Sequence, residues 1–304
     1  MSFEYFFIPS KMPFDETPLE EFFDGRRHYS VKKGTARYEN LGTGVQFTIE
    51  FGTGLVTAGE SELPLDETRL ILFLDYLVPT FFAQEAALEI EALMDTFELR
   101  IYDPQDERMQ NGAFNAELFV SDYRKHATAA ARSLHEEFKS TEWPGTASRA
   151  ALDKVWDWNY WRDDLQIALD EELFVPTIEF VHHEGSVKTA VVWGDGVPAL
   201  LPKVDVVLAG YMEIAPKAGL LRRQKRFFDY IPYDEFKEEF ADVLHPNEDV
   251  EGALQCVRED AETVIEKLKS RAPRAKQYLD APQRKRLFET KRPAEIVDQE
   301  LTAS

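Results

Sequence analysis

The sequence contains little cysteine and no long hydrophobic run. Its single cysteine, Cys256, excludes a disulfide bond within the chain. No stretch approaches the roughly 18 uncharged apolar residues that a membrane-spanning helix needs, and residues 1–11 lack the basic and apolar regions of a secretory signal peptide. We therefore expect a protein of the reducing cytoplasm that does not bind membranes.

Motifs of common catalytic sites are also missing. There is no Gly-x-Ser-x-Gly nucleophile elbow, and the helical spacing predicted over residues 252–270 favours a buried structural thiol at Cys256. The stretch LGTGV (41–45) precedes a strand and offers no phosphate-binding lysine, so it predicts a turn. His182 and His183 are adjacent on a predicted strand and point to opposite faces, which disfavours a shared metal ion. We expect no catalytic residue, metal or cofactor, with an enzyme of an unrecognised class as the alternative.

Negative charge is abundant. The chain has 56 Asp and Glu against 35 Lys and Arg, a formal net charge of −21. Such a surface repels nucleic-acid phosphates and attracts basic proteins, although solubility alone would explain it equally well. Residues 267–304 are the exception, with ten basic and five acidic side chains. This basic end either folds against the acidic body or forms a mobile tail.

Hydrophobic periodicity predicts an α+β fold. Residues 69–79 fit either a buried strand or the start of an apolar helix, because period alone does not distinguish them. The other strands are expected at 3–9, 28–33, 36–52 (a hairpin), 98–104 and 174–212, and helices at 15–25, 81–97, 115–139, from 148 onward, and 233–243. The chain is thereby divided into an N-terminal α+β unit (1–112), a helical connector (113–172), an antiparallel β region (173–232) and a C-terminal helical segment with a basic tail (233–304), forming one or two compact domains.

The segment VWDWNYWRDDLQIALDEEL (155–173) combines three of the five tryptophans with six acidic residues. On a helix, one stripe is expected to be core, and it consists of Val155, Trp158, Leu165 and Leu169, flanked by Trp161 and Ala168. A different side carries Asp153, Trp156, Asp157, Tyr160, Asp163 and Asp164. Either Trp156 packs beneath the β region, or this side is an aromatic anchor with an acidic rim that binds a Lys- and Arg-rich protein.

A second acidic face is predicted over residues 233–252. Phe236, Phe240 and Val243 form its apolar stripe. The candidate partner-binding residues outside this stripe are Glu235, Glu238, Glu239 and Asp242. The alternative is an ordinary solvated helix face. The basic cluster RRQKRFFDY (222–230) is expected to form ion pairs with the acidic helices rather than to bind nucleic acid.

Several stretches together resemble an uncharacterised family of bacterial proteins often encoded beside secreted toxins. They are YENLGTGVQFTIEF (38–51), YDPQDERMQNGAF (102–114), VWDWNYWRDDL (155–165) and FVPTIEFVHHEGSVKTAVVWGDGVPALLPKVDVVL (174–208). The resemblance covers most of residues 1–240, assigns no catalytic residues, and does not extend to 245–304. It implies an immunity protein that binds and neutralises a cognate toxin, including toxins of type VI secretion systems. A structural or accessory component of a secretion system is the alternative.

Overall fold

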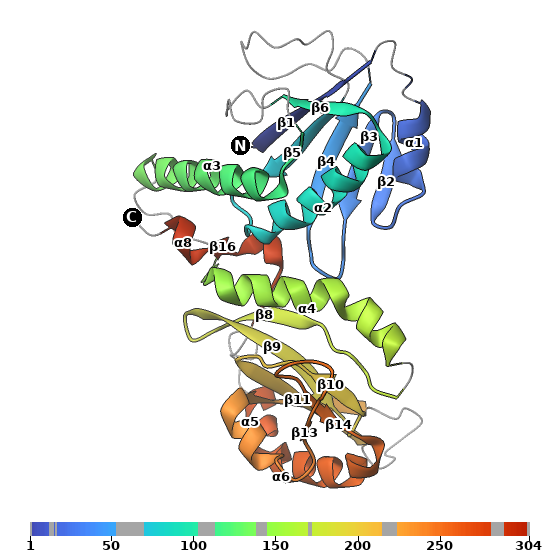
Figure 1. Cartoon of the computed structure of the whole chain (residues 1–304). Coiled ribbons are helices and arrows are strands. Elements are labelled where there is room, and N and C mark those ends of the chain that lie inside the picture. Colours follow the sequence, from blue (N-terminus) through green and yellow to red (C-terminus); the bar gives the residue numbers. More distant parts are fainter. Residues whose placement is uncertain are drawn as a thin grey trace. The chain divides into compact units, whose positions relative to one another are not determined.

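The computed structural model shows a chain that folds into two compact units (Figure 1). The structure describes residues 2–11, 15, 17–52, 70–102, 113–137, 145–169, 172–214, 224–280 and 289–302. The first unit comprises Met1–Leu152 and Pro293–Ser304, and the second comprises Asp153–Arg292. Helices and sheets occur in both, which confirms the predicted α+β class. The first unit joins two segments that are distant in the sequence, whereas the second is continuous. The finer boundaries at residues 112, 172 and 232 stay predictions.

The first unit is built on a six-stranded antiparallel sheet with the strand order β2-β3-β4-β5-β1-β6. Its strands are β1 (Ser2–Pro9), β2 (Tyr29–Lys32), β3 (Thr35–Glu39), β4 (Gln46–Phe51), β5 (Leu70–Asp75) and β6 (Leu99–Tyr102). Strands β3 and β4 form the predicted hairpin, and Val45, Phe47, Ile49 and Phe51 are all buried. Strand β5 settles the ambiguity at 69–79 in favour of a strand.

Three helices accompany this sheet, namely α1 (Thr17–Asp24), α2 (Phe81–Thr96) and α3 (Ala116–Glu137). Figure 1 shows α2 and α3 lying across one face of the sheet. Alternate residues of β1 point to that face, so Phe3 and Tyr5 meet Phe119 of α3 at ring-centroid distances of 5.6 and 5.0 Å. The aromatic strand FEYFFIP therefore provides much of the core between sheet and helices.

The C-terminal residues return to the first unit. They form η3 (Pro293–Glu295), β16 (Val297–Asp298) and α8 (Gln299–Thr302). Strand β16 pairs in parallel with β7 (Thr146–Ala147), and α8 packs against α3. Ile296, Val297 and Leu301 are buried. This end of the predicted basic tail is therefore part of the folded core of the unit.

The second unit contains a five-stranded sheet with the order β12-β11-β9-β8-β15. Its strands are β8 (Ile178–His183), β9 (Ser186–Gly194), β11 (Val206–Ile214), β12 (Gln224–Pro232) and β15 (Glu289–Lys291). The predicted hairpin turn is present between β8 and β9, where Glu184 and Gly185 have φ values of 48° and 81°. The β region is antiparallel as predicted except for the pair β9 and β11, which runs parallel.

Helices α5 (Tyr233–Glu239) and α6 (Ala261–Asp280) pack against this sheet, on the side opposite to α4 (Arg149–Ala168) (Figure 1). Trp193 of β9 contacts Phe236 and Phe240 at centroid distances of 5.5 and 5.9 Å, so the predicted apolar stripe of α5 is core. Within the described parts of the chain, no helix has the length and apolar character required to cross a bilayer.

The helix predicted over residues 252–270 is wrong in its first half. Cys256 lies on strand β14 (Leu254–Cys256), and α6 begins only at Ala261 after the short helix η2 (Arg258–Asp260). Strand β14 is the centre of a three-stranded sheet with β10 (Ala199–Leu201) and β13 (His245–Pro246). Pairing with β10, more than 50 residues away, outweighs the local helical spacing.

Candidate functional site

Helix α4 carries apolar side chains on two opposite sides. Its inner side packs Trp158, Leu165 and Leu169 against a core cluster that includes Val175 and Leu200. This confirms the predicted core position of these three residues, whereas Trp161 and Ala168, predicted to flank the stripe, are exposed. Residues of the other side follow the spacing i, i+4, i+7 and i+11, beginning at Trp156, and form a second stripe.

Polar side chains on the inner side fasten α4 to the extended segment 173–178. Asn159 is 7% exposed, donates to the carbonyl of Ile178 and accepts from its N–H, both at 2.9 Å. Gln166 accepts from Val175 N–H at 2.9 Å and donates to the carbonyl of Leu173 at 3.0 Å. These contacts fix the rotation of α4 about its axis, and therefore fix which side chains it turns outward.

Two further residues complete this attachment. The indole Nε1 of Trp158 donates to the carbonyl of Pro176 at 2.8 Å, and Nε of Arg162 donates to that of Val175 at 3.0 Å. Asn159, Arg162 and Gln166 were not among the residues predicted from the sequence. Their spacing of three and four residues on the core side of an amphipathic helix was the available signal.

We call the second stripe and its flanking residues the α4 outer face. It consists of Trp156, Asp157, Tyr160, Trp161, Asp163, Asp164 and Ile167. Trp156 contacts Tyr160 at 5.4 Å between ring centroids, and Tyr160 meets Trp161 edge to face at 5.1 Å. Trp161 is 51% exposed and Ile167 is 76% exposed. In this row of touching rings Trp156 and Tyr160 are half-buried, so the exposed apolar surface of the α4 outer face consists of Trp161 and Ile167.

Carboxylates surround these rings. Asp157, Asp163 and Asp164 are exposed, and Asp163 also accepts from Arg162 at 2.9 Å. Asp153, which belongs to the same predicted group, is half-buried one turn before the rings. The structure therefore places Asp157, Asp163 and Asp164 at the surface beside the rings, whereas Asp153 contributes little exposed charge. That this group binds a partner stays a prediction.

The second predicted group, on α5, is arranged differently. Arg271 of α6 is 9% exposed and binds three carboxylates: Asp229 at 2.5 Å, Glu235 at 3.0 Å, and Glu239. Burial opposes the charged guanidinium, but the hydrogen bonds to Asp229 and Glu235 outweigh it and raise the pKa of Arg271. Two of the four predicted α5 carboxylates are thus already paired within the unit.

Lys267 pairs with a third of the four predicted carboxylates, that of Asp242. Its Nζ lies 2.9 Å from the carboxylate of Asp242, and this hydrogen bond lowers the pKa of that carboxyl. The same Nζ donates to the carbonyl of Glu239 at 2.8 Å. Of the predicted α5 group, Glu238 is exposed and forms no ion pair with another described residue. Folding of the basic end against the acidic body, one of the two predicted alternatives, is therefore observed at Lys267 and Arg271.

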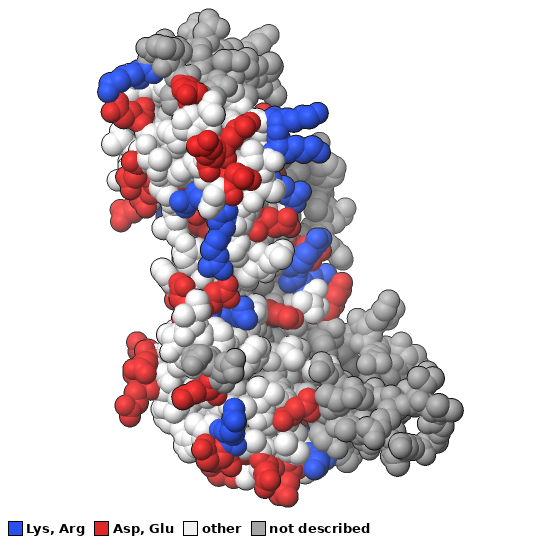
Figure 2. All heavy atoms as spheres, turned by 90° about the vertical axis from the view of Figure 1, so that its right-hand side faces the viewer, with Lys and Arg blue, Asp and Glu red and all other residues white. Residues whose placement is uncertain are grey.

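The two predicted groups do not form one site. Helices α4 and α5 lie on opposite sides of the five-stranded sheet of the second unit (Figure 1). Figure 2 shows a face of the molecule on which acidic and basic side chains alternate rather than forming one continuous acidic area. The side chains of residues 222–226, part of the predicted basic cluster, lie outside the described residues.

Histidine and cysteine side chains form no metal site among the residues that the structure describes. His183 packs its ring on Tyr230 at 4.2 Å, and His182 is paired in register with Glu289 of β15. Cys256 is fully buried, and burial raises its pKa to about 11. A thiol with these properties is protonated at neutral pH and is a poor nucleophile.

The first unit has a hollow of about 300 Å³ on its sheet. Its lining residues are Ser2, Arg37, Gln46, Phe47, Thr48, Phe73, Leu74 and Asp75. Arg37 donates to Gln46 at 3.4 Å, and Ser2 donates to Glu4 at 3.3 Å. These contacts are typical of a polar sheet surface, and we assign no reaction to them. Residues 103–112, part of the stretch YDPQDERMQNGAF named above, lie outside the described residues.

Comparison of this chain with protein-family models, with curated proteins and with solved structures finds no match.

Proposed function

We propose that this protein binds a basic bacterial toxin stoichiometrically and neutralises it, as an immunity protein does. The α4 outer face carries the proposal, because it combines touching aromatic rings with exposed carboxylates on a helix that is fixed from its inner side. Protein interfaces concentrate their binding free energy in a few such aromatic anchors surrounded by a polar rim.

Charge supports the same function. The net charge of −21 accelerates encounter with a basic protein, and the exposed carboxylates of Asp157, Asp163 and Asp164 lie beside the anchor where the partner must dock. The acidic residues of α5 are a weaker surface for this purpose, because Glu235, Glu239 and Asp242 would have to exchange Arg271 and Lys267 for the partner. The toxin would therefore meet α4 rather than α5.

The direct test is co-expression with the product of the adjacent gene. The proposal expects that product to be toxic alone, harmless together with this chain, and recovered with it in a one-to-one complex. A product that is harmless alone, or that remains lethal and unbound, contradicts the proposal.

Variants then locate the surface. Asp163→Asn combined with Asp164→Asn should slow association several-fold at low ionic strength, whereas Trp161→Ala should mainly accelerate dissociation, by about tenfold or more. Glu238→Gln on α5 is the matched control and should change neither rate. Equal rates for all these variants would show that α4 is not the binding surface.

A further inference from the structure

The loop of residues 40–44 joins β3 to β4 and carries the stretch LGTGV that the sequence identifies as a turn. Its tip residue, Leu41, is 86% exposed, more than any other large apolar side chain in the described part of the chain. Loops are usually more mobile than the elements that they connect. The loop around Leu41 is instead held by hydrogen bonds at nearly every position.

The first set of these bonds lies within the loop. Asn40 Oδ1 accepts from the N–H groups of Gly42 at 2.9 Å and Thr43 at 3.4 Å, while the carbonyl of Asn40 accepts from Gly44 N–H at 2.7 Å. The N–H of Asn40 donates to the carbonyl of Val45 at 2.9 Å, which closes the loop. Gly44 has a φ of +76°, which favours glycine there.

A buried carboxylate supports the loop from α2. Glu85 is 0% exposed, and its Oε1 accepts from Tyr38 at 2.7 Å, Asn40 at 2.7 Å and Thr43 at 3.1 Å. Burying a carboxylate is unfavourable unless hydrogen bonds compensate for the lost water. Here the compensation comes from three side chains of the loop and its preceding strand, so Glu85 and the loop stabilise each other.

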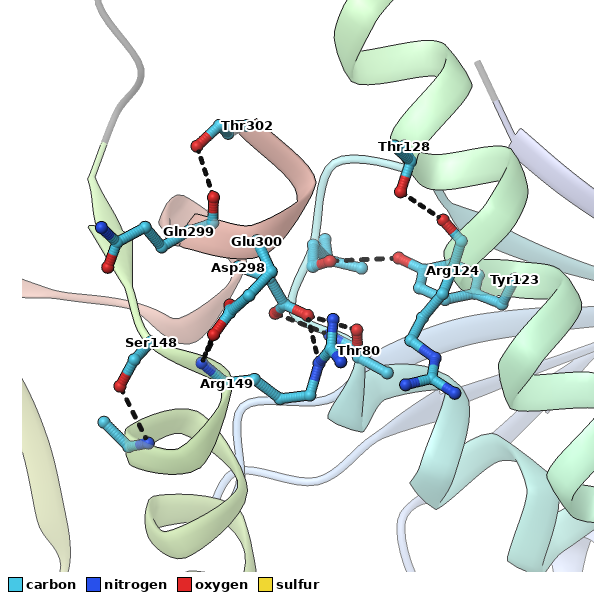
Figure 3. Close-up of polar contacts among 12 residues, drawn as sticks. Thr80, Tyr123, Arg124, Thr128, Ser148, Arg149, Asp298, Gln299, Glu300 and Thr302 are labelled. Carbon is cyan, nitrogen blue, oxygen red and sulfur yellow. Dashed lines mark hydrogen bonds and ion pairs between the residues drawn. The ribbon is translucent and has the colours of Figure 1, made fainter. Parts of the chain in front are cut away.

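The returning C-terminal segment supports the loop from another direction. Pro293 packs so closely against Gly44 that an added Cβ would lie 2.7 Å from the proline ring. Asp298, further along this segment, accepts from Thr80 N–H at 3.1 Å and also bonds the Thr80 hydroxyl and Arg149 (Figure 3). The segment that holds Pro293 in place is thus itself fastened inside the first unit.

We infer that residues 40–44 are a preformed docking loop, and that Leu41 is an anchor which enters an apolar pocket of the same basic protein. This inference rests on the proposed function. A loop that is already ordered loses little conformational entropy on binding, so a single buried leucine contributes more of its transfer free energy to affinity. Apolar anchors that fill a pocket are typical hot spots of interfaces.

Charge selects this occupant over two others. A second copy of the chain would carry the same charge of −21 and would be repelled. An anionic lipid surface is disfavoured by the same charge and by the exposed Glu39 that precedes the loop. A basic protein is attracted both by the net charge and by Glu39.

The experiment measures binding of the purified product of the adjacent gene to the full-length chain and to three variants by biolayer interferometry. Leu41→Ala should raise the dissociation constant about 10- to 100-fold without changing the melting temperature, because the side chain is exposed. Leu88→Ala, which removes a 39% exposed leucine from α2 of the same unit, should leave both unchanged. Thr43→Val keeps Leu41 but removes one donor to Glu85, and should weaken binding to a lesser extent.

The outcomes separate the two proposals. If the wild-type chain binds and Leu41→Ala binds equally well, the docking loop is refuted while the proposed function stands. If the wild-type chain does not bind, the proposed function fails and the docking loop fails with it. If Leu41→Ala instead dissociates a dimer of this chain, detected by size-exclusion chromatography with light scattering, the occupant is a second copy and the inference is wrong.

Discussion

Replacing Asn159 by alanine tests whether α4 is fixed by its inner side. The side chain forms two hydrogen bonds of 2.9 Å to the backbone N–H and carbonyl of Ile178, at the end of β8 that β15 does not reach. Asn159→Ala leaves both backbone groups without this partner in a site that is 7% exposed. An unpaired buried polar group costs about 1–3 kcal/mol. Because water can partly replace the side chain, we expect a loss of roughly 2–4 kcal/mol in the free energy of unfolding of the second unit.

Two companion variants sharpen this test. Asp157→Ala changes an exposed residue of the same helix and should alter the stability by less than about 0.5 kcal/mol. Asn159→Asp keeps the acceptor for Ile178 N–H but turns a carboxylate toward the carbonyl. A protonated carboxyl donates to that carbonyl, so folding raises the pKa of the new group, and the variant should lose stability as the pH rises from the unfolded to the folded pKa.

The measurement combines urea unfolding, followed by circular dichroism, with hydrogen exchange at the amide of Ile178. Exchange localises the effect, which matters because two compact units need not unfold together. If Asn159→Ala is as stable as Asp157→Ala and the Ile178 amide keeps its protection, then α4 is not held by these bonds. The argument that its outer face is preorganised would then lose its basis.

Three further predictions concern buried ionisable groups. Arg271→Met leaves its three carboxylate partners without their cation. In urea unfolding, this variant should destabilise the second unit by about 3–5 kcal/mol. The control variant Lys269→Met, on the exposed side of α6, should leave the stability nearly unchanged. Burial raises the pKa of Glu89, so its folded form retains a proton that the unfolded form loses, and stability should fall as the pH rises from the unfolded to the folded pKa. Glu89→Gln should reduce this slope relative to the exposed control Glu91→Gln; an unchanged slope contradicts the assignment. Cys256, buried and with a pKa of about 11, should resist iodoacetamide at pH 8 in the folded chain and react rapidly in urea, as followed by mass spectrometry; rapid labelling of the folded chain would show that it is accessible.

Local patterns in the sequence predicted most of the elements. Alternation at Val45, Phe47, Ile49 and Phe51 is sufficient to define the hairpin, because a strand with one buried face shows this period directly. The core stripe of α4 was predicted in the same way. Where the local pattern was ambiguous, at residues 69–79, pairing of β5 with both β1 and β4 decided for a strand.

What the sequence could not show are contacts between distant segments. Cys256 was assigned to a helix because its pairing with β10 has no local signature. The acidic residues of α5 looked available for a partner, whereas Arg271, more than 30 residues later, binds Glu235 and Glu239. The support of the 40–44 loop likewise depends on Glu85. In each case the deciding partner lies too far along the chain for spacing to reveal it.

The return of residues 293–302 to the first unit has a practical consequence for anyone dividing the molecule. A fragment that stops at residue 152 would lack Asp298, Leu301 and the strand that pairs with β7, and would expose the apolar surface they cover. The first unit should be expressed as two joined pieces, with a short linker in place of residues 153–292. The second unit is continuous in sequence and can be cut out in one piece, which is the arrangement expected of a domain inserted into another.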